Sequence, residues 1–327
     1  MQFKVYDIKI SINHQKSKAM KTLRNISLIA AVAGVLFTFS CSKERTEKEV
    51  QTDYASLDDF YDLNQPDEQT FVIDSTGNDT IVGQDGTRIW GIPKEIFMIK
   101  STQQDISYPY TLKLIEAYSI KNMILSRLPG IAQGSLLHSG GEVKITAFKN
   151  TDELAIKNTF FLPFWSPSAS PVNAMETFYG FTNGTTGDFN NDVLQTDYLF
   201  SSDNVSSVSI SGNGYLTHMA KLGWLNIGKK VTPSSQSNIT FTASGTNTNY
   251  IDIFVVFNNL HNYVKAANMA ANNLPTGEPI TVFAIAKDGS GTMYYFKDNF
   301  TVSNGLQITL NMTASTEAQI LSELAGL

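Results

Sequence analysis

Three oxygen-bearing side chains at alternate positions form the clearest metal-binding pattern in this chain. Asp188, Asn190 and Asp192 lie in the segment GDFNNDVLQTD. Carboxylate and amide oxygens at this spacing are typical of the first ligands of a Ca²⁺-binding loop. The rest of the pattern is absent, because Val193 stands where such a loop needs glycine and Leu199 where it needs a bidentate glutamate. The segment is therefore either a Ca²⁺ site or a solvated turn rich in Asx residues. Ca²⁺ is the one cofactor that the sequence suggests.

The histidines do not form a recognisable metal-binding motif. His138, His218 and His261 lie far apart in the sequence, and none has a second His or Cys at ligand spacing. We therefore expect surface or capping roles for them, with a zinc site built from distant strands as the alternative. Gly140 and Gly141 follow His138-Ser139, and this glycine pair predicts a tight hairpin turn.

No motif of an enzyme is recognisable in the sequence. The Gly-x-Ser-x-Gly elbow of hydrolases and the phosphate-binding loops are both absent from it. Acidic residues are plentiful, but sequence alone pairs no two of them across a cleft. Trp165, next to prolines in FWSPSASP, is a candidate platform for stacking on a sugar, although aromatic residues of β-proteins commonly serve in packing. We expect a protein that is not an enzyme.

The N-terminal region has the features of a secretory signal. Lys21 and Arg24 precede an uncharged apolar run, Ile26–Phe39, which is short for a membrane-spanning helix. The TFSC tetrapeptide that follows resembles a bacterial lipobox, and it ends at Cys41, the single cysteine of the chain. This resemblance implies that Cys41 carries lipid, and a lone cysteine has no disulfide partner within the chain. A short transmembrane anchor is the alternative, and Met20 is the expected start of translation.

The charge balance argues against a nucleic-acid partner. The chain has 24 basic and 30 acidic residues and a formal net charge of −6, with no basic stripe. Residues 41–86 are polar and acidic, so we expect a tether, with short strands in TFVID and DTIVG as the alternative.

Beyond this segment the hydrophobic pattern is that of strands. Leu112 and Leu114 alternate with neighbours of the other face, with Glu116 as a candidate for the same side, and Val143 and Ile145 alternate in the same way. Several further runs of this kind are separated by Gly, Asn, Ser and Pro, which favours antiparallel β-sandwiches. The fold class is therefore mainly β, with two antiparallel β-sandwich modules.

One helix is expected, at the C-terminus. Thr316 and Gln319 form a capping box, and Ile320, Leu321 and Leu324 form an apolar face that we expect to dock on the second module. The predicted organisation is an N-terminal extension with signal peptide (1–40), a tether (41–86), a first module (87–165), a linker (166–198), and a second module with the C-terminal helix (199–327).

Five segments resemble a module of extracellular lipoproteins of Bacteroidetes. They are GTRIWGIPKEIF, LIEAYSIKNMILSRLPG, GSLLHSGGEVKITAF, LGWLNIG and NLPTGEPITVFAIA, and the resemblance covers most of residues 85–315. It departs at Ile227 and Gly228, where Cys-Asp is usual. The first module also has a faint similarity to ZU5-type β-modules. These resemblances imply a β-rich surface protein and no catalytic residue.

These patterns lead to two functional hypotheses. The first is a lipid-anchored protein of the outer membrane, facing the cell surface or the periplasm, that acts in binding, adhesion or assembly without catalysis. Its partners would be the membrane, through the N-terminal lipid, and a glycan or a surface protein. The second hypothesis is a carbohydrate-binding accessory lipoprotein of a polysaccharide-uptake system.

Overall fold

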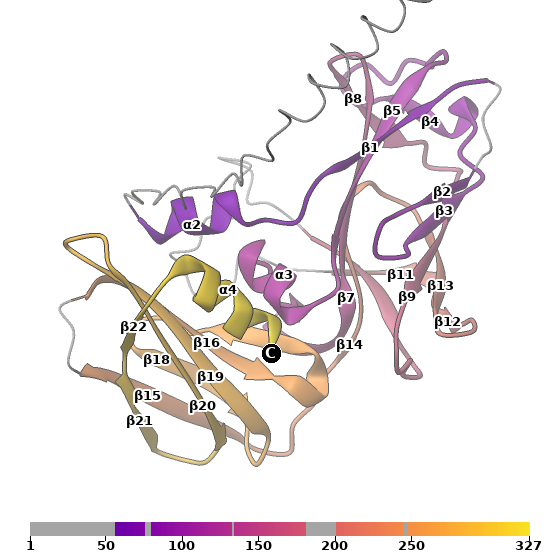
Figure 1. Cartoon of the computed structure of the whole chain (residues 1–327). Helices are drawn as coiled ribbons and strands as arrows, with labels where there is room; N and C mark the ends of the chain where they lie inside the picture. The colour runs from indigo at the N-terminus through magenta and orange to yellow at the C-terminus, as the bar shows by residue number, and fades with distance from the viewer. Residues whose placement is uncertain (1–55, 76–79, 133, 181–200, 245–247) are drawn as a thin grey trace, which may run out of the picture. The chain divides into compact units, whose positions relative to one another are not determined.

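Antiparallel β-sheets make up most of the folded chain (Figure 1), which confirms the predicted fold class. The computed structural model of the chain describes residues 56–75, 80–132, 134–180, 201–244 and 248–327. They all belong to one compact unit, residues 54–327. We divide this unit into an N-terminal lobe, formed by the sheets of β1 to β14, and a C-terminal lobe, formed by the sheets of β15 to β22 with the last helix.

Two sheets form the N-terminal lobe. The larger has nine described strands, and its main path runs β1-β5-β7-β14-β10-β11, with β6 and β8 paired with β7 and β4 paired with β8. Its strands are β1 Gln69–Ile73, β4 Phe97–Ile99, β5 Tyr110–Ala117, β6 Ile131–Ala132, β7 Ser135–Lys149, β8 Asp152–Ile156, β10 Glu176–Tyr179, β11 Ser201–Ser207 and β14 Gly223–Lys230. The second sheet has the order β12-β13-β9-β3-β2. It consists of β2 Thr80–Val82, β3 Arg88–Trp90, β9 Leu162–Pro167, β12 Ser209–Ile210 and β13 Gly214–Met219, and a 3₁₀ turn, η1 Lys94–Ile96, follows β3.

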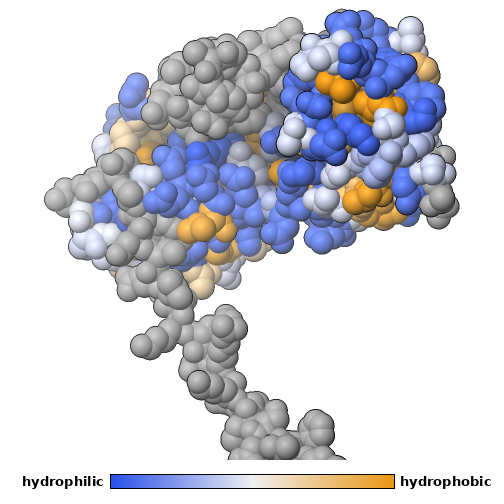
Figure 2. Space-filling model, turned by 90° about the horizontal axis from the view of Figure 1, so that it is seen from above, coloured by the Kyte–Doolittle hydropathy of each residue, from blue (hydrophilic) through white to orange (hydrophobic). Residues whose placement is uncertain are grey.

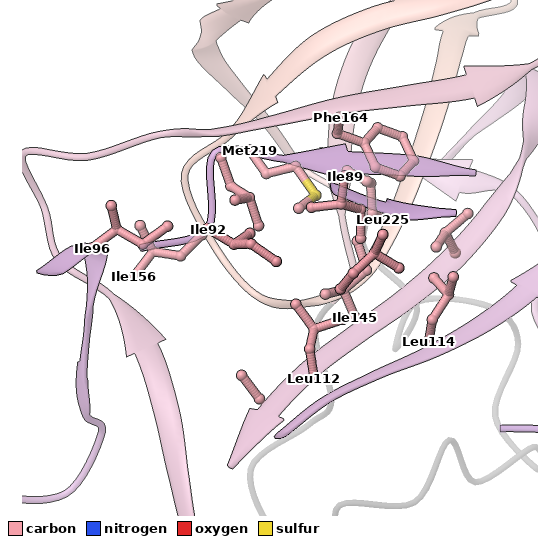
Figure 3. Packing of buried hydrophobic residues seen from close by; sticks show 14 of the residues in the cluster. Ile89, Ile92, Ile96, Leu112, Leu114, Ile145, Ile156, Phe164, Met219 and Leu225 are labelled. Atoms are coloured by element: carbon pink, nitrogen blue, oxygen red, sulfur yellow. The ribbon is translucent and has the colours of Figure 1, made fainter. Parts of the chain in front are cut away.

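A hydrophobic core fills the space between these two sheets. Leu112 and Ile145 of the larger sheet are fully buried and face Phe164 of the smaller one (Figure 3). The alternation of β5 and of the second half of β7 produces this arrangement, because every second side chain of a strand points to the same face. The predicted inward faces of β5 and β7 are thus confirmed.

The C-terminal lobe pairs a small sheet with a larger one. The small sheet, β18-β15-β21, contains β15 Gln236–Ser244, β18 Ala270–Pro275 and β21 Leu306–Asn311, and β15 pairs with β21 in parallel. The larger sheet, β17-β16-β19-β20-β22, contains β16 Thr248–Phe257, β17 Asn262–Lys265, β19 Pro279–Asp288, β20 Met293–Thr301 and β22 Thr313–Ser315. A 3₁₀ turn, η2 Asn258–Leu260, joins β16 to β17. The strand β19 is buried almost throughout, because one of its faces meets the small sheet and the other meets helices.

Three short helices cover the outer face of this larger sheet (Figure 1). They are α2 Leu57–Leu63, α3 Ile120–Leu125 and α4 Glu317–Ala325. In α4 the Thr316 side chain accepts a hydrogen bond from the Gln319 backbone N–H at 3.2 Å, and Ile320 and Leu324 are buried. These contacts confirm the predicted C-terminal helix, its N-terminal cap and its docking face.

The acidic segment before residue 86 is folded in its described parts, residues 56–75 and 80–86, which differs from the expected tether. Tyr61 of α2 is buried and donates a hydrogen bond to Asp252 at 2.8 Å, and Arg127 forms ion pairs with Asp58 and Asp62. The two runs considered as alternative strands are β1 and β2. The physical reason is that the few apolar residues of this segment are spaced to pack on a surface supplied by the rest of the chain.

The module boundaries also differ from the expected ones. β13 and β14, which we expected in the second module, pair with β9 and β7 of the N-terminal lobe. β10, from the expected linker, pairs with β14. Local periodicity shows which face of a strand is apolar but not which distant strand it pairs with, so the boundary near residue 165 was misplaced.

The buried amide of Asn262 forms hydrogen bonds between the two lobes. Its Oδ1 accepts from the backbone N–H of Gly130 at 2.9 Å, and its Nδ2 donates to the backbone carbonyls of Gly130 and Leu137 at 2.7 and 2.8 Å. Oδ1 also accepts from the N–H of Tyr263 at 2.7 Å. This amide thus satisfies four backbone groups in a place from which water is excluded.

On the face shown in Figure 2, the coloured surface is mainly hydrophilic, with separate apolar patches. The large apolar residues that are most exposed are Leu63, Val72, Val82, Phe160, Phe161 and Ile210. None of the helices in the described parts of the chain has the length and hydrophobicity needed to cross a membrane.

Candidate ligand-binding cavity

A cavity of about 450 Å³ lies where the N-terminal lobe meets η2 of the C-terminal lobe. Six segments line it: Asp85 of the β2–β3 turn, Tyr118 after β5, residues 138–140 of β7, residues 167–170 at and beyond the end of β9, Tyr215 of β13, and Asn258, Asn259 and His261 at η2. Its volume falls within the range of small-molecule sites. A smaller cavity of about 290 Å³ beside β17 and β18 has a mainly aliphatic wall, with Lys265 as its one ionisable side chain.

Two glycines shape the wall of the larger cavity at β7. A Cβ on Gly140 would lie 2.9 Å from the Tyr215 ring, and one on Gly141 would lie 2.5 Å from the Tyr118 ring. Gly141 also has a φ of +101°, a conformation that favours glycine. The predicted hairpin turn at this site is wrong, because the two glycines lie inside the continuous strand β7. The pairing of β7 with β14 shifts register here, so the glycines form a β-bulge instead of a turn.

The opposite wall is held by a buried glutamate. Glu116 accepts hydrogen bonds from the backbone N–H groups of Asp85 and Thr87, both at 2.9 Å, and from the Gln69 side chain at 2.8 Å. A carboxylate with several N–H donors is a strong anchor. Glu116 therefore fixes the turn that brings Asp85 to the cavity.

Two histidines that are remote in sequence line this cavity together. His261 lies 122 residues from Ser139, and its Nδ1 is 3.3 Å from the backbone oxygen of Ser139. Burial lowers the pKa of His261, although hydrogen bonds to the Ser139 and Tyr118 carbonyls oppose this effect. Burial, followed by the nearby His261 and Lys229, also lowers the pKa of His138. Both imidazoles are therefore mainly neutral at pH 7.

A fully buried polar cluster lies next to Ser139. Asn226 donates through Nδ2 to Ser139 Oγ and to Glu142 Oε1, both at 3.0 Å. Glu142 is fully buried, and burial raises its pKa well above the ordinary value despite the opposing hydrogen bond from Asn226. Within the described chain, Glu142 Oε2 and Asn226 Oδ1 have no hydrogen-bond partner. Glu142 is therefore expected to carry a proton in the folded state.

The residue that departs from the lipoprotein pattern lies beside this cluster. A Cβ on Gly228 would lie 2.8 Å from Asn226 Oδ1 and 3.2 Å from the His138 carbonyl oxygen. Glycine therefore fits at this position, whereas a larger residue would displace its neighbours.

Trp165, the predicted sugar platform, lies on β9 and does not line the cavity. Its ring is half-buried, the Arg88 guanidinium lies 5.3 Å from the ring centroid, and its indole N–H donates to the Ser211 carbonyl at 3.0 Å. These contacts are those of a packed tryptophan with part of its surface covered.

The remaining predicted site residues fall into two groups. His218 is exposed on β13, away from the cavity. Cys41, Asp188, Asn190 and Asp192 lie outside the described residues, so the lipidation and Ca²⁺ predictions stay predictions. In the described ranges no group of three or more His, Cys, Asp or Glu side chains is placed to hold a metal ion.

Sequence reasoning missed the residues that build this region: Glu116 as an anchor, the Asn226–Glu142 pair, and Asn262. The sequence did contain one signal. Glu116 and Glu142 occupy inward-pointing positions in strands whose apolar residues alternate, and a charged residue at such a position needs partners. No local pattern could have shown that His261 lies beside β7.

Comparisons with known proteins assign no family to this chain. No protein-family model matches it, and no curated protein is significantly similar. Among solved structures, the major pilin subunit of Bacillus cereus is similar over 76% of this chain and 95% of that one, with 9% sequence identity and a TM-score of 0.19. A similarity this low carries no argument about function.

Proposed function

We propose that this chain is a lipid-anchored protein of the cell envelope that binds a ligand without transforming it. The observation that carries the binding part is the cavity of about 450 Å³, whose walls come from both lobes and are fixed by partly buried hydrogen bonds. Walls fixed in this way reduce the entropy lost when a ligand binds.

The arrangement around Ser139 favours binding over nucleophilic catalysis. The Ser139 hydroxyl is buried and accepts hydrogen bonds from the Gly141 N–H and from Asn226, both at 3.0 Å. The nearest imidazole, that of His261, contacts the backbone oxygen of Ser139. Activation of a serine needs a base within hydrogen-bond reach of the hydroxyl itself, so this geometry suits a structural serine.

The anchoring part rests on the sequence around Cys41. Replacement of Cys41 by alanine is expected to move the protein from the membrane fraction to the soluble fraction and to abolish its labelling by radioactive palmitate, because the lipid would have no attachment point. Ultracentrifugation of lysed cells followed by immunoblotting measures the partition.

Ser42→Ala is the matched control, since it changes the neighbouring residue and leaves the thiol in place. It should remain in the membrane fraction. Retention of the Cys41→Ala protein in that fraction would show that the lipid anchor is wrong.

A further inference from the structure

The cavity described above has a lining that indicates the chemistry of its ligand. No Lys or Arg is among the described side chains that line it, and its two histidines are mainly neutral at pH 7. An anionic ligand would therefore lack a countercharge, and moving it out of water would be costly.

The same lining is poorly suited to a cation. Asp85 is the only acidic side chain among the described residues of the lining, and burial followed by the charge of Glu116 raises the pKa of Asp85. A raised pKa means that the surroundings disfavour negative charge, whereas a cation site gathers several such charges. An uncharged ligand remains.

Several polar side chains in the lining have hydrogen-bonding capacity to spare. In the part of the chain that the structure describes, Asn259, Ser168 and Ser170 make no side-chain hydrogen bond, and all three line the cavity. His138 contributes a neutral imidazole that can accept or donate. These groups match a ligand with many hydroxyls, because each can both donate to and accept from an alcohol.

The remaining wall is apolar and is formed by side-chain rings. Tyr118 is half-buried, with its hydroxyl held 2.7 Å from Thr87 Oγ1, and Pro167 lies in the same lining. Tyr215 is 1% exposed and supports this wall from behind, with its hydroxyl accepting a hydrogen bond from the Val172 N–H at 2.7 Å. The partly exposed rings of Tyr118 and Pro167 offer flat apolar contact to the C–H face of a sugar.

We propose that this cavity binds an uncharged saccharide, with its hydroxyl groups bonded to Asn259, His138 and Ser168 and one C–H face against the rings of Tyr118 and Pro167. The proposal rests on the proposed binding function and names its ligand class. It differs from the Trp165 hypothesis, because Trp165 lies outside the cavity.

The test uses the full-length chain purified in detergent micelles on an array of polysaccharides. The neutral probes are mannan, xylan, galactan and starch, and the acidic probes are alginate and polygalacturonate. We expect retention on at least one neutral probe and not on the acidic ones. Retention on acidic probes alone, or on no probe, overturns the proposal.

Variants then locate the site by titration calorimetry with oligosaccharides of the retained glycan. Asn259→Ala and His138→Ala are each expected to weaken binding roughly tenfold, the effect of losing one good hydrogen bond. Asn272→Ala, an exposed asparagine on β18, and Trp165→Ala should leave binding unchanged. Loss of binding in Trp165→Ala, with no loss in the two cavity variants, also overturns the proposal.

Failure of the inference and failure of the proposed function give different results. Chromatography of the glycan after prolonged incubation shows whether the chain shortens it. A bound but cleaved glycan would contradict the non-catalytic function and leave the saccharide assignment intact. An unbound glycan would contradict the assignment, whereas the Cys41→Ala experiment would still decide on anchoring.

Discussion

Replacement of Asn262 by alanine is expected to lower the free energy of unfolding by about 3 to 5 kcal/mol. The side chain is fully buried, and its amide bonds the Gly130 N–H, the Gly130 and Leu137 carbonyls and the Tyr263 N–H. Alanine would remove these hydrogen bonds in a place that water does not reach, and each group left unpaired costs about 1 to 3 kcal/mol. The Gly130 carbonyl would still accept from the Leu137 N–H at 2.9 Å. Urea denaturation followed by circular dichroism measures the change.

Two controls make this expectation specific. Asn272→Ala removes an exposed asparagine from the neighbouring strand β18 and should change stability by less than about 0.5 kcal/mol. Gly130→Ala should also destabilise the protein, because the new Cβ would lie 2.6 Å from Asn262 Nδ2 and displace the same amide. An Asn262→Ala protein as stable as Asn272→Ala would show that the amide does not hold the lobes together.

Replacement of Glu142 by glutamine is expected to stabilise the protein at neutral pH. Burial raises the pKa of Glu142 in the folded state above its ordinary value of 4.5, so the folded state retains a proton that the unfolded state releases. The contribution of this group to stability is therefore complete below pH 4.5 and declines as the pH rises toward the folded-state pKa. The decline is about 1.4 kcal/mol for each pH unit in that interval. Glutamine does not titrate, so the advantage of Glu142→Gln over the parent should grow with pH and vanish near pH 4.

The nearby Glu116 provides a contrasting control, because it is also buried but has three N–H donors around its carboxylate. Glutamine at position 116 would point its amide N–H groups at these N–H donors, where no acceptor remains for them. Glu116→Gln should therefore destabilise the protein by about 1 to 3 kcal/mol. Unfolding free energies measured from pH 4 to pH 8 for both variants separate the two cases. A Glu142→Gln advantage that does not change with pH would contradict a protonated Glu142.

The sequence by itself determined the class of the fold and the faces of individual elements. The alternation in β5 and β7 and the Thr316 cap of α4 were predicted and confirmed, because they depend on neighbours within a few residues. The N-terminal pattern at Cys41 is of the same local kind, and it remains the basis of the proposed anchoring.

Only the tertiary structure decided which distant segments meet. The pairing of β14 with β7, the docking of α2 and the contact of His261 with the Ser139 carbonyl join residues that are 78 or more positions apart. Asn262 and Gly130 are separated by 132 residues. Local periodicity sets which side of an element is apolar, whereas these contacts depend on how complete surfaces fit and on which buried polar groups must find partners. The cavity exists only because such contacts bring its walls together, so no stretch of the sequence read alone could show it.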